Sequence, residues 1–242
     1  MRWLLLVLAG LVGLQLFFIL RIAFMTVVDP QSTTFQRSEA WRIATQKPTG
    51  LRWRQEWVPY AGISDNLKRA VIASEDDGFV NHDGVDWEAI EKAWQRNAKA
   101  EAEAARRAQA RTQATRVRQP KIVGGSTITQ QLAKNLLLSG ERTFLRKGQE
   151  MVLTFALERF LSKERILEIY LNNVEWGEGV FGAEAAARHY YRKSASRLTP
   201  YEAARLAVML PRPRYFEKLP HSEYLANRAG VIVGRMRDAE LP

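Results

Sequence analysis

The chain contains no cysteine, and only three of its 242 residues are histidines. The missing thiols exclude a disulfide framework, a thiol nucleophile and Cys-ligated metals, but they do not decide the compartment, since many periplasmic proteins also lack cysteine. The histidines, at 82, 189 and 221, are widely spaced, which argues against a His-rich metal site. Strand signals are scarce and no internal repeat is visible, so the sequence predicts an all-α, mainly helical fold.

Acidic residues are outnumbered, with 26 Asp and Glu against 36 Lys and Arg and a net charge of +10. A basic protein favours an anionic partner, which includes nucleic acid, an anionic membrane surface and a phosphorylated substrate. A solvated basic face without a ligand explains the excess equally well. The bases are scattered and form no recognisable nucleic-acid-binding module, which argues against a nucleic-acid partner.

One long apolar run covers 3–20 near the N-terminus, and Gln15 is its only strongly polar residue. About 20 apolar residues cross a bilayer as a helix. The alternative is a cleaved signal peptide, with an apolar core of about 7–15 residues and then small residues at the cleavage site. This run is longer, and bulky side chains stand at 17–19. The sequence therefore predicts an uncleaved transmembrane signal anchor over 1–28.

The basic residues around the anchor leave its orientation open, because one precedes the run and three follow it: Arg2, then Arg21, Arg37 and Arg42. The next segment, 29–60, mixes prolines with tryptophans, which predicts a membrane-proximal linker that becomes structured. The remainder, 61–242, is predicted to be a single helical domain.

Residues 64–74 predict a short helix that has Ser64 as N-cap and Asp65 in its first turn. It ends at two acids, Glu75 and Asp76, so Glu75 is expected at a helix end that faces a cleft.

A basic segment at 98–121 follows a helix that Asp86 is predicted to cap. The segment is rich in Ala, Arg and Gln and has almost no large apolar side chain, so it is an exposed helix or a mobile loop rather than core. Its bases could contact lipid head groups, and a solvated loop is the alternative.

Residues 124–150 contain polar side chains of many kinds, together with the short apolar segment 136–138. Arginine gives phosphate bidentate contacts and lysine gives it a point charge, so the bases and hydroxyls here suit a diphosphate. The two glycines at its start do not form a nucleotide phosphate loop, because no GKS or GKT follows them.

The rest of the chain is also predicted to be helical. The expected elements are two helices between Gly148 and Asn173 divided at Ser162, a glycine-rich loop at 177–182, and helices at 183–191, from Thr199 onward and over 222–237. Glu150 would lie on or just before the first turn of the helix from Gly148.

Three acids compete for a catalytic role: Glu75, Asp76 and Glu150. Sugar chemistry often uses two carboxylates on opposite walls of a cleft, one for the hydroxyl proton and one for the departing group. Glu150 could instead form a structural ion pair with Arg146 and Lys147.

Four ordered segments resemble the signatures of a known enzyme family. They are EDDGFVNHDG at 75–84, GGSTITQQLAKN at 124–135, RKGQE at 146–150, and the stretch that begins KERILEIYLNN at 163–191. Each alone is weak, but their joint occurrence is highly specific. The chain resembles the peptidoglycan glycosyltransferases of the monofunctional biosynthetic type over residues 65–215.

The resemblance implies a lysozyme-like glycosyltransferase domain, mainly helical, beside a bacterial inner membrane that one helix crosses, with the domain on the periplasmic side. It implies polymerisation of lipid II with β-1,4 links, inversion and release of undecaprenyl diphosphate. The implied partners are lipid II, the growing glycan strand and the membrane, without nucleic acid; other cell-wall synthesis proteins are left open. No cofactor is certain, and a divalent cation, Mg²⁺ or Mn²⁺, is left open because no dedicated ligand set is visible.

The resemblance also implies residue roles. Glu75 would be the general base on the 4-hydroxyl of the incoming lipid II, and Glu150 would assist the diphosphate side or orient its bases. The phosphate contacts would come from Lys134 and Arg142, supported by Arg146 and Lys147. The cleft would be lined by Ser126, Thr127, Gln130, Gln131 and Asn135. Phe79 and His82 are expected to hold the loop after Glu75.

Two other functions compete with this one. A lytic muramidase of related fold would cleave the same glycan with a single catalytic Glu, whereas the paired signatures and the phosphate-suited bases favour synthesis. A non-enzymatic basic binding protein is the other alternative. A transpeptidase activity is not indicated: the Ser-Asp-Asn at 64–66 mimics one of its signatures, but the chain has no Ser-x-x-Lys and no Lys-Thr-Gly.

Overall fold

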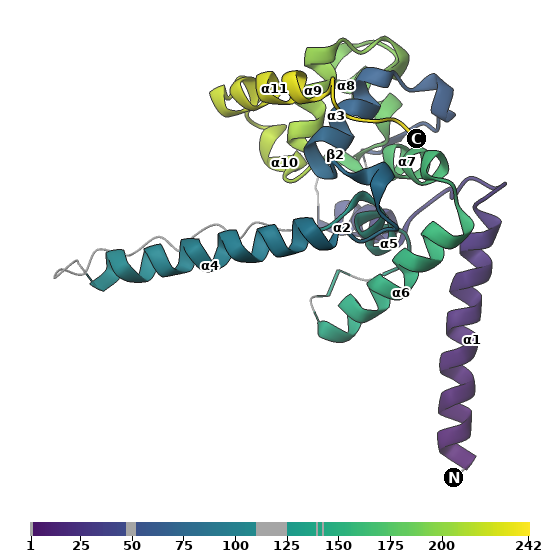
Figure 1. Cartoon of the computed structure of the whole chain (residues 1–242). Helices are drawn as coiled ribbons and strands as arrows, with labels where there is room; N and C mark the ends of the chain where they lie inside the picture. The colour runs from purple at the N-terminus through teal and green to yellow at the C-terminus, as the bar shows by residue number, and fades with distance from the viewer. Residues whose placement is uncertain (1, 47–51, 110–124, 139, 142) are drawn as a thin grey trace.

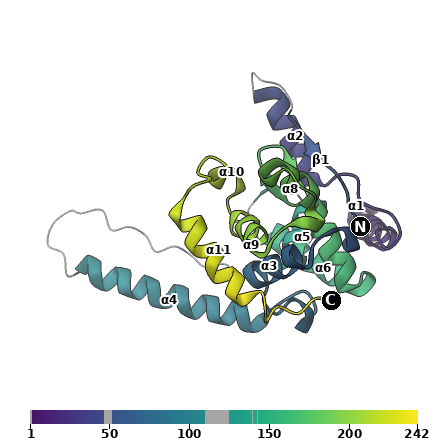
Figure 2. The same cartoon turned by 90° about the horizontal axis from the view of Figure 1, so that it is seen from above.

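The computed structural model describes residues 2–46, 52–109, 125–138, 140–141 and 143–242. Helices dominate these ranges, which confirms the predicted mainly helical fold. Two long helices, α1 (Arg2–Phe24) and α4 (Trp87–Gln109), leave the body of the molecule in different directions (Figure 1). Seen from above, α1 is viewed nearly end-on while α4 extends sideways (Figure 2).

The remaining elements are short and follow one another closely. In chain order they are α2 (Thr34–Gln46), β1 (Arg54–Gln55), a 3₁₀ turn (Tyr60–Gly62), α3 (Asp65–Glu75), a 3₁₀ turn (Phe79–Asn81), α5 (Ile128–Leu137), α6 (Phe144–Phe160), α7 (Lys163–Asn173), β2 (Glu175–Gly177), β3 (Val180–Phe181), α8 (Ala183–Tyr191), a 3₁₀ turn (Ala195–Arg197), α9 (Pro200–Met209), α10 (Pro213–Phe216) and α11 (Glu223–Arg235).

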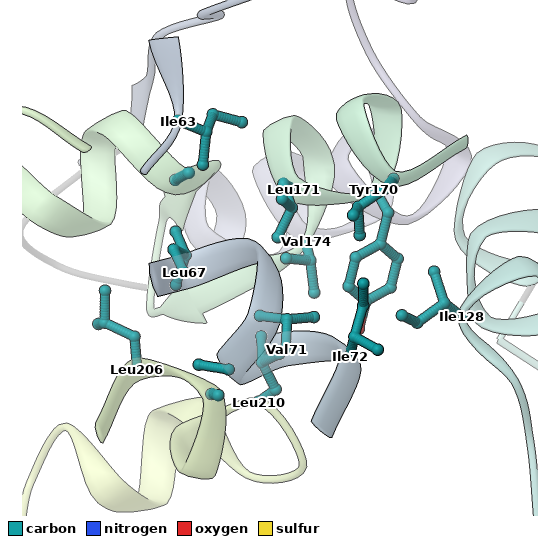
Figure 3. Close-up of a cluster of buried hydrophobic side chains, with 14 of the residues drawn as sticks. Ile63, Leu67, Val71, Ile72, Ile128, Tyr170, Leu171, Val174, Leu206 and Leu210 are labelled. Carbon is teal, nitrogen blue, oxygen red and sulfur yellow. The ribbon is translucent and has the colours of Figure 1, made fainter. Parts of the chain in front are cut away.

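Helix α3 lies at the centre of the core, where it packs against α9 and α11. Its side chains Leu67 and Val71 are buried, and Leu67 lies near Leu206 of α9 (Figure 3). On its other side, Ile72 lies near the ring of Tyr170 (Figure 3). The core thereby holds the C-terminal end of α3, and with it Glu75, beside α7.

The helix starts that were predicted from capping residues are confirmed. Ser64 caps α3, which ends at Glu75 as expected. The side chain of Asp86 accepts a hydrogen bond of 2.8 Å from a backbone amide in the first turn of α4. Thr199 and Glu202 form a capping box at the start of α9.

Helix α6 begins earlier than predicted. It starts at Phe144 rather than at Gly148, because the side chain of Thr143 caps it by accepting a hydrogen bond from Arg146. The prediction that Glu150 lies on or just before the first turn was therefore wrong, since Glu150 is in the second turn.

The glycine-rich segment 177–182, predicted to be a loop, belongs to a small three-stranded sheet with strand order β1-β3-β2. β3 pairs antiparallel with β2 and parallel with β1. Gly179 has φ +73°, and a Cβ there would lie 2.0 Å from the carbonyl oxygen of Arg52. Only glycine permits this close approach of two backbones.

Helix α2 lies within the segment predicted as a linker, 29–60. Thr34 Oγ1 donates to the carbonyl of Leu136 at 3.0 Å, and Gln36 Nε2 donates to the carbonyl of Asn173 at 3.3 Å. These bonds attach α2 to α5 and to α7. The boundary at 61 stays a prediction.

Helix α1 is long and apolar enough to cross a membrane, and none of its most apolar 18-residue window is buried. Ile22 is its one buried residue. The basic segment 98–121 is helical as far as Gln109, and the rest of it lies outside the described residues.

Candidate active site

Two cavities meet near the start of α5. The larger, of about 660 Å³, is bounded by residues of α2, α5 and α6. The smaller, of about 370 Å³, lies against the end of α3 and the start of α4. Ser126 lines both cavities, so they adjoin at this residue. Helices α2 and α5 lie together at the base of the body, near the points where α1 and α4 leave it (Figure 1).

The predicted site residues divide between these cavities. The larger one is lined by Ser126, Gln130, Gln131, Lys134, Asn135, Arg146, Lys147 and Glu150. The smaller one is lined by Glu75 and Thr127 together with Ser126. Arg142 lies outside the described residues.

Glu150 is held by the two bases that precede it on α6. Arg146 Nη1 lies 2.7 Å from Glu150 Oε2, and Lys147 Nζ donates to Oε1. Spacings of three and four residues place these side chains on one face of the helix. The side chain of Glu150 is only 4% exposed, whereas that of Lys147 is 44% exposed. The ion pair considered from the sequence is thus present, and it places both bases at the cavity wall.

Arg146 also has an unused donor. Its Nε is buried and has no hydrogen-bond partner among the described residues. A buried donor without a partner costs about 1–3 kcal/mol. Arg146 also lines the larger cavity, where a guanidinium suits an anionic ligand.

Glu75 is the last residue of α3 and accepts a hydrogen bond of 3.0 Å from Gln131 Nε2. Burial raises the pKa of Glu75, and the neighbouring charge of Asp76 adds to the rise. The hydrogen bonds from Gln131 and Ser74 and the positive charge of Lys134 oppose it. A carboxylate with a raised pKa at the edge of a cavity is suited to accept a proton.

The amide of Gln131 is oriented by Tyr170, whose hydroxyl donates to Gln131 Oε1 at 3.0 Å. Burial raises the pKa of Tyr170 well above its usual range, as do the charges of Glu75 and Asp76. The hydroxyl therefore stays protonated at neutral pH and turns the NH₂ group of Gln131 toward Glu75. In the sequence, Tyr170 falls within the predicted helix that follows Ser162 and carries no sign of a polar role. Its polar role depends on the packing of α3, α5 and α7, which leaves no local signal.

Asp76, the third candidate acid, has both carboxylate oxygens engaged. Its Oδ1 lies 2.8 Å from His82 Nε2, and its Oδ2 accepts a hydrogen bond of 2.9 Å from the backbone amide of Ile128. Lys163 donates to the carbonyl of His82 and lies over the ring of Phe79, 4.7 Å from its centroid. These contacts support a structural role for Asp76 and the expectation that Phe79 and His82 hold the loop.

Two of the predicted lining residues form the capping box of α5. Thr127 Oγ1 accepts from the amide of Gln130 and donates to the carbonyl of Gly84 at 2.6 Å, while Gln130 Oε1 accepts from the amide of Thr127. Gly84 has φ +86°, and a Cβ there would lie 2.7 Å from the side chain of Thr154. The hydroxyl of Thr127 is therefore engaged within the protein, whereas Ser126 is exposed at the point where the cavities adjoin.

The comparison with known proteins decides the family. Residues 43–237 match the family model described as Transglycosylase. The chain belongs to the transglycosylase family. Its relatives include biosynthetic peptidoglycan transglycosylases from Burkholderia thailandensis, with 53% identity over 228 residues (94% of this chain and 82% of the relative), and from Herminiimonas arsenicoxydans, with 51% identity over 242 residues (99% and 96%).

These relatives confirm the resemblance seen in the four sequence segments. The transglycosylase is a peptidoglycan glycosyltransferase with a lysozyme-like helical fold, and it polymerises glycan strands of peptidoglycan. The muramidase and the non-enzymatic binding protein, considered from the sequence, are therefore not supported.

The larger cavity of the transglycosylase has a wall that the sequence did not suggest. Thr34, Phe35 and Ser38 of α2 line it, and so does Glu175 of β2. Burial raises the pKa of Glu175, although the hydrogen bonds and positive charge of Arg214 oppose the rise. The sequence of α2 was predicted to be part of a linker, which gave no reason to expect it at the cavity. Its packing against α5 in the folded protein places it there.

Within the described ranges of the transglycosylase, no group of three or more His, Cys, Asp or Glu side chains could hold a metal ion.

Proposed function

We propose that the transglycosylase extends a lipid-linked glycan with lipid II by passing a proton to Glu75 while the bases of α5 and α6 hold the departing diphosphate. The 4-hydroxyl oxygen of the incoming lipid II attacks the anomeric carbon of the growing strand and forms the new C–O bond. The bond from that carbon to the phosphate oxygen breaks, and its electron pair leaves with undecaprenyl diphosphate. Attack opposite the leaving group inverts the carbon and gives a β-1,4 link.

One observation carries this proposal: a hydrogen bond from Gln131 connects the larger cavity to Glu75 in the smaller one. Gln131 lines the larger cavity, and Glu75 lines the smaller one. A proton acceptor with a raised pKa thus lies next to a cavity lined by basic side chains. That is the arrangement required when a hydroxyl loses its proton as an anionic group departs.

The phosphate wall, defined as Lys134, Arg146 and Lys147, would bind the diphosphate of the lipid-linked substrate and keep the same contacts as it departs, so its loss is expected to weaken substrate binding. All three residues line the larger cavity. Glu150 would act as a positioning residue, because its two oxygens hold Arg146 and Lys147. Arg142, which lies outside the described residues, remains a predicted phosphate contact.

The membrane is the second proposed partner. We propose that α1 is a single-pass anchor in the bacterial inner membrane and that the catalytic domain, from about residue 61, is periplasmic, with 29–60 between them. Trp87, Ile90 and Trp94 recur at helical spacing on α4, and both tryptophans are exposed. Because α4 extends sideways from α1 (Figure 2), it has the direction of a helix that lies in the membrane interface.

The products formed from labelled lipid II by the purified full-length protein test this proposal. Long glycan strands that a muramidase can digest are expected. No product from lipid II, together with soluble fragments released from finished cell wall, would contradict it and support a lytic enzyme. Adding a chelator to the same assay tests whether a divalent cation takes part.

A further inference from the structure

Helices α1 and α6 are joined by a reciprocal pair of amide hydrogen bonds. Gln15 Nε2 donates to Gln149 Oε1 at 2.8 Å, and Gln149 Nε2 donates back to Gln15 Oε1 at 3.0 Å. The two residues are 134 positions apart in the chain, and the two helices pack against each other. The pair therefore ties the predicted membrane anchor directly to the helix that carries Glu150.

Gln15 stands in an environment where its amide needs a partner. It is the only strongly polar residue in the apolar run 3–20. It lies nine residues before Phe24, the end of α1, and so about 13 Å along the helix axis from that end. An amide without a partner in hydrocarbon is costly, which is why polar residues in membrane helices face a partner. The reciprocal pair satisfies one donor and one acceptor on each side chain.

The other half of the pair lies within the functional part of α6. Gln149 directly precedes Glu150 and follows Arg146 and Lys147 by three and two residues. Successive helix residues are about 100° apart around the axis. A contact that fixes the direction of Gln149 therefore also fixes the directions in which Arg146 and Glu150 point.

We propose that Gln15 is a positioning residue of the active site: through Gln149 it sets the rotation of the first two turns of α6 and thereby places the phosphate wall. The anchor is then a structural part of the substrate site as well as a tether. This inference rests on the phosphate wall assigned under the proposed function.

Kinetics with lipid II in the full-length protein test the proposal. Gln15→Leu and Gln149→Leu are each expected to raise KM for lipid II by about three- to tenfold, the range typical of one interhelical hydrogen bond in a membrane, with little change in kcat. The double variant Gln15→Leu/Gln149→Leu should lose no more than either single variant, since both remove the same interaction.

A matched control separates position from composition. The variant Gln15→Leu/Leu16→Gln has the composition of the natural chain, but its glutamine is turned by about 100°, to a position that is 53% exposed. It should resemble Gln15→Leu. Natural KM values in this variant, or in both single variants, would overturn the proposal. The proposal would also be overturned if kcat, the affinity for lipid II and the thermal stability all fell to the same extent, because that pattern indicates general destabilisation.

Two further measurements complete the test. The acidic limb of the pH–rate profile should stay in place in the Gln15 variants, since Glu75 lies on α3. Because the natural chain has no cysteine, Gln15→Cys/Gln149→Cys should be cross-linked in membranes by a short thiol-reactive linker, and more efficiently than Leu16→Cys/Gln149→Cys. No such difference would contradict the contact.

Failure of this inference differs from failure of the proposed function. If Arg146→Ala and Glu150→Gln raise KM but Gln15→Leu does not, only the role of the anchor is wrong. If Arg146→Ala and Glu150→Gln also leave KM unchanged, the phosphate wall itself is wrong.

Discussion

At the scale of single residues, the ionisation of Glu75 depends on a chain of three side chains from three helices. Tyr170 holds Gln131, and Gln131 donates to Glu75. Burial raises the pKa of Glu75, and the Gln131 hydrogen bond limits the rise because it stabilises the charged form. A base must be deprotonated to act, so activity is lost as the pH falls through this pKa.

Gln131→Leu removes the hydrogen bond that favours the carboxylate, so the pKa of Glu75 should rise further. The acidic limb of kcat/KM is then expected to move to higher pH by about one unit, since a hydrogen bond to a charged group contributes about 1.5–3 kcal/mol. Tyr170→Phe should cause a smaller shift in the same direction. Tyr190→Phe is the control, because Tyr190 donates elsewhere, to the carbonyl of Trp176. A limb that stays in place in Gln131→Leu would refute this account.

At the scale of elements, the start of α5 is held by a carboxylate from the loop after α3. Asp76 accepts from the amide of Ile128, where the positive end of the helix dipole favours a negative charge. This contact joins the two helices that carry Glu75 and Gln131. The position of Glu75, the proposed proton acceptor, therefore depends on a buried acid whose two oxygens are both engaged within the protein.

Asp76→Asn should lower the free energy of unfolding by about 1–3 kcal/mol, because it removes a charged acceptor from a buried hydrogen bond. Asp77→Asn is the matched control: its carboxylate is 61% exposed and pairs with Arg235 at the surface, so a change within about 0.5 kcal/mol is expected. Thermal or denaturant unfolding of both variants measures the difference. Equal losses in the two variants would show that Asp76 does not hold α5.

The elements that sequence reasoning could predict are those with strong local signals. The caps at Ser64, Asp86 and Thr199 are such signals. Helix α2 was missed because tertiary hydrogen bonds, such as that of Thr34 to α5, hold a helix whose own pattern is mixed. The strands β2 and β3 have three and two residues, too few for an alternating pattern to show. The early start of α6 is marked by the cap that the side chain of Thr143 provides, which the sequence analysis did not consider.

At the scale of the whole molecule, the directions of α1 and α4 are both compatible with a single placement of the protein at a membrane. In the proposed arrangement α1 would cross the bilayer, and α4, which extends in a different direction (Figures 1 and 2), would lie along its surface. Phe144 and Leu145, at the start of α6, are 98% and 87% exposed. Such exposed apolar side chains near a membrane anchor favour contact with lipid. The substrate would then reach the cavities without its lipid leaving the membrane.

The double variant Trp87→Ala/Trp94→Ala should lose activity several-fold in proteoliposomes but little in detergent. The reason is that the two tryptophan side chains that it removes are proposed to contact the bilayer. Trp41→Ala is the control, since Trp41 is similarly exposed, at 73%, but lies on α2. Initial rates in both media provide the comparison. An equal loss in detergent and in proteoliposomes would argue against α4 as an interfacial helix.

The sequence motifs could predict many of the residues that line the two cavities, but not which cavity each one lines. The four segments led to Glu75, Glu150 and the phosphate wall. They did not indicate that Glu75 lines a separate cavity, or that Ser126 lies where the two cavities adjoin. Both facts depend on how α3, α5 and α6 pack together, which no single segment encodes.

The rate of lipid II polymerisation by Glu75→Gln tests the central claim most directly, because this change keeps the shape of the side chain and removes the base. Glu223→Gln, an identical change at an exposed position on α11, is the matched control and should retain the natural rate. The account predicts that Glu75→Gln is folded and at least about 100-fold slower, the usual contribution of a general base. A folded Glu75→Gln protein that polymerises lipid II at nearly the natural rate would contradict it.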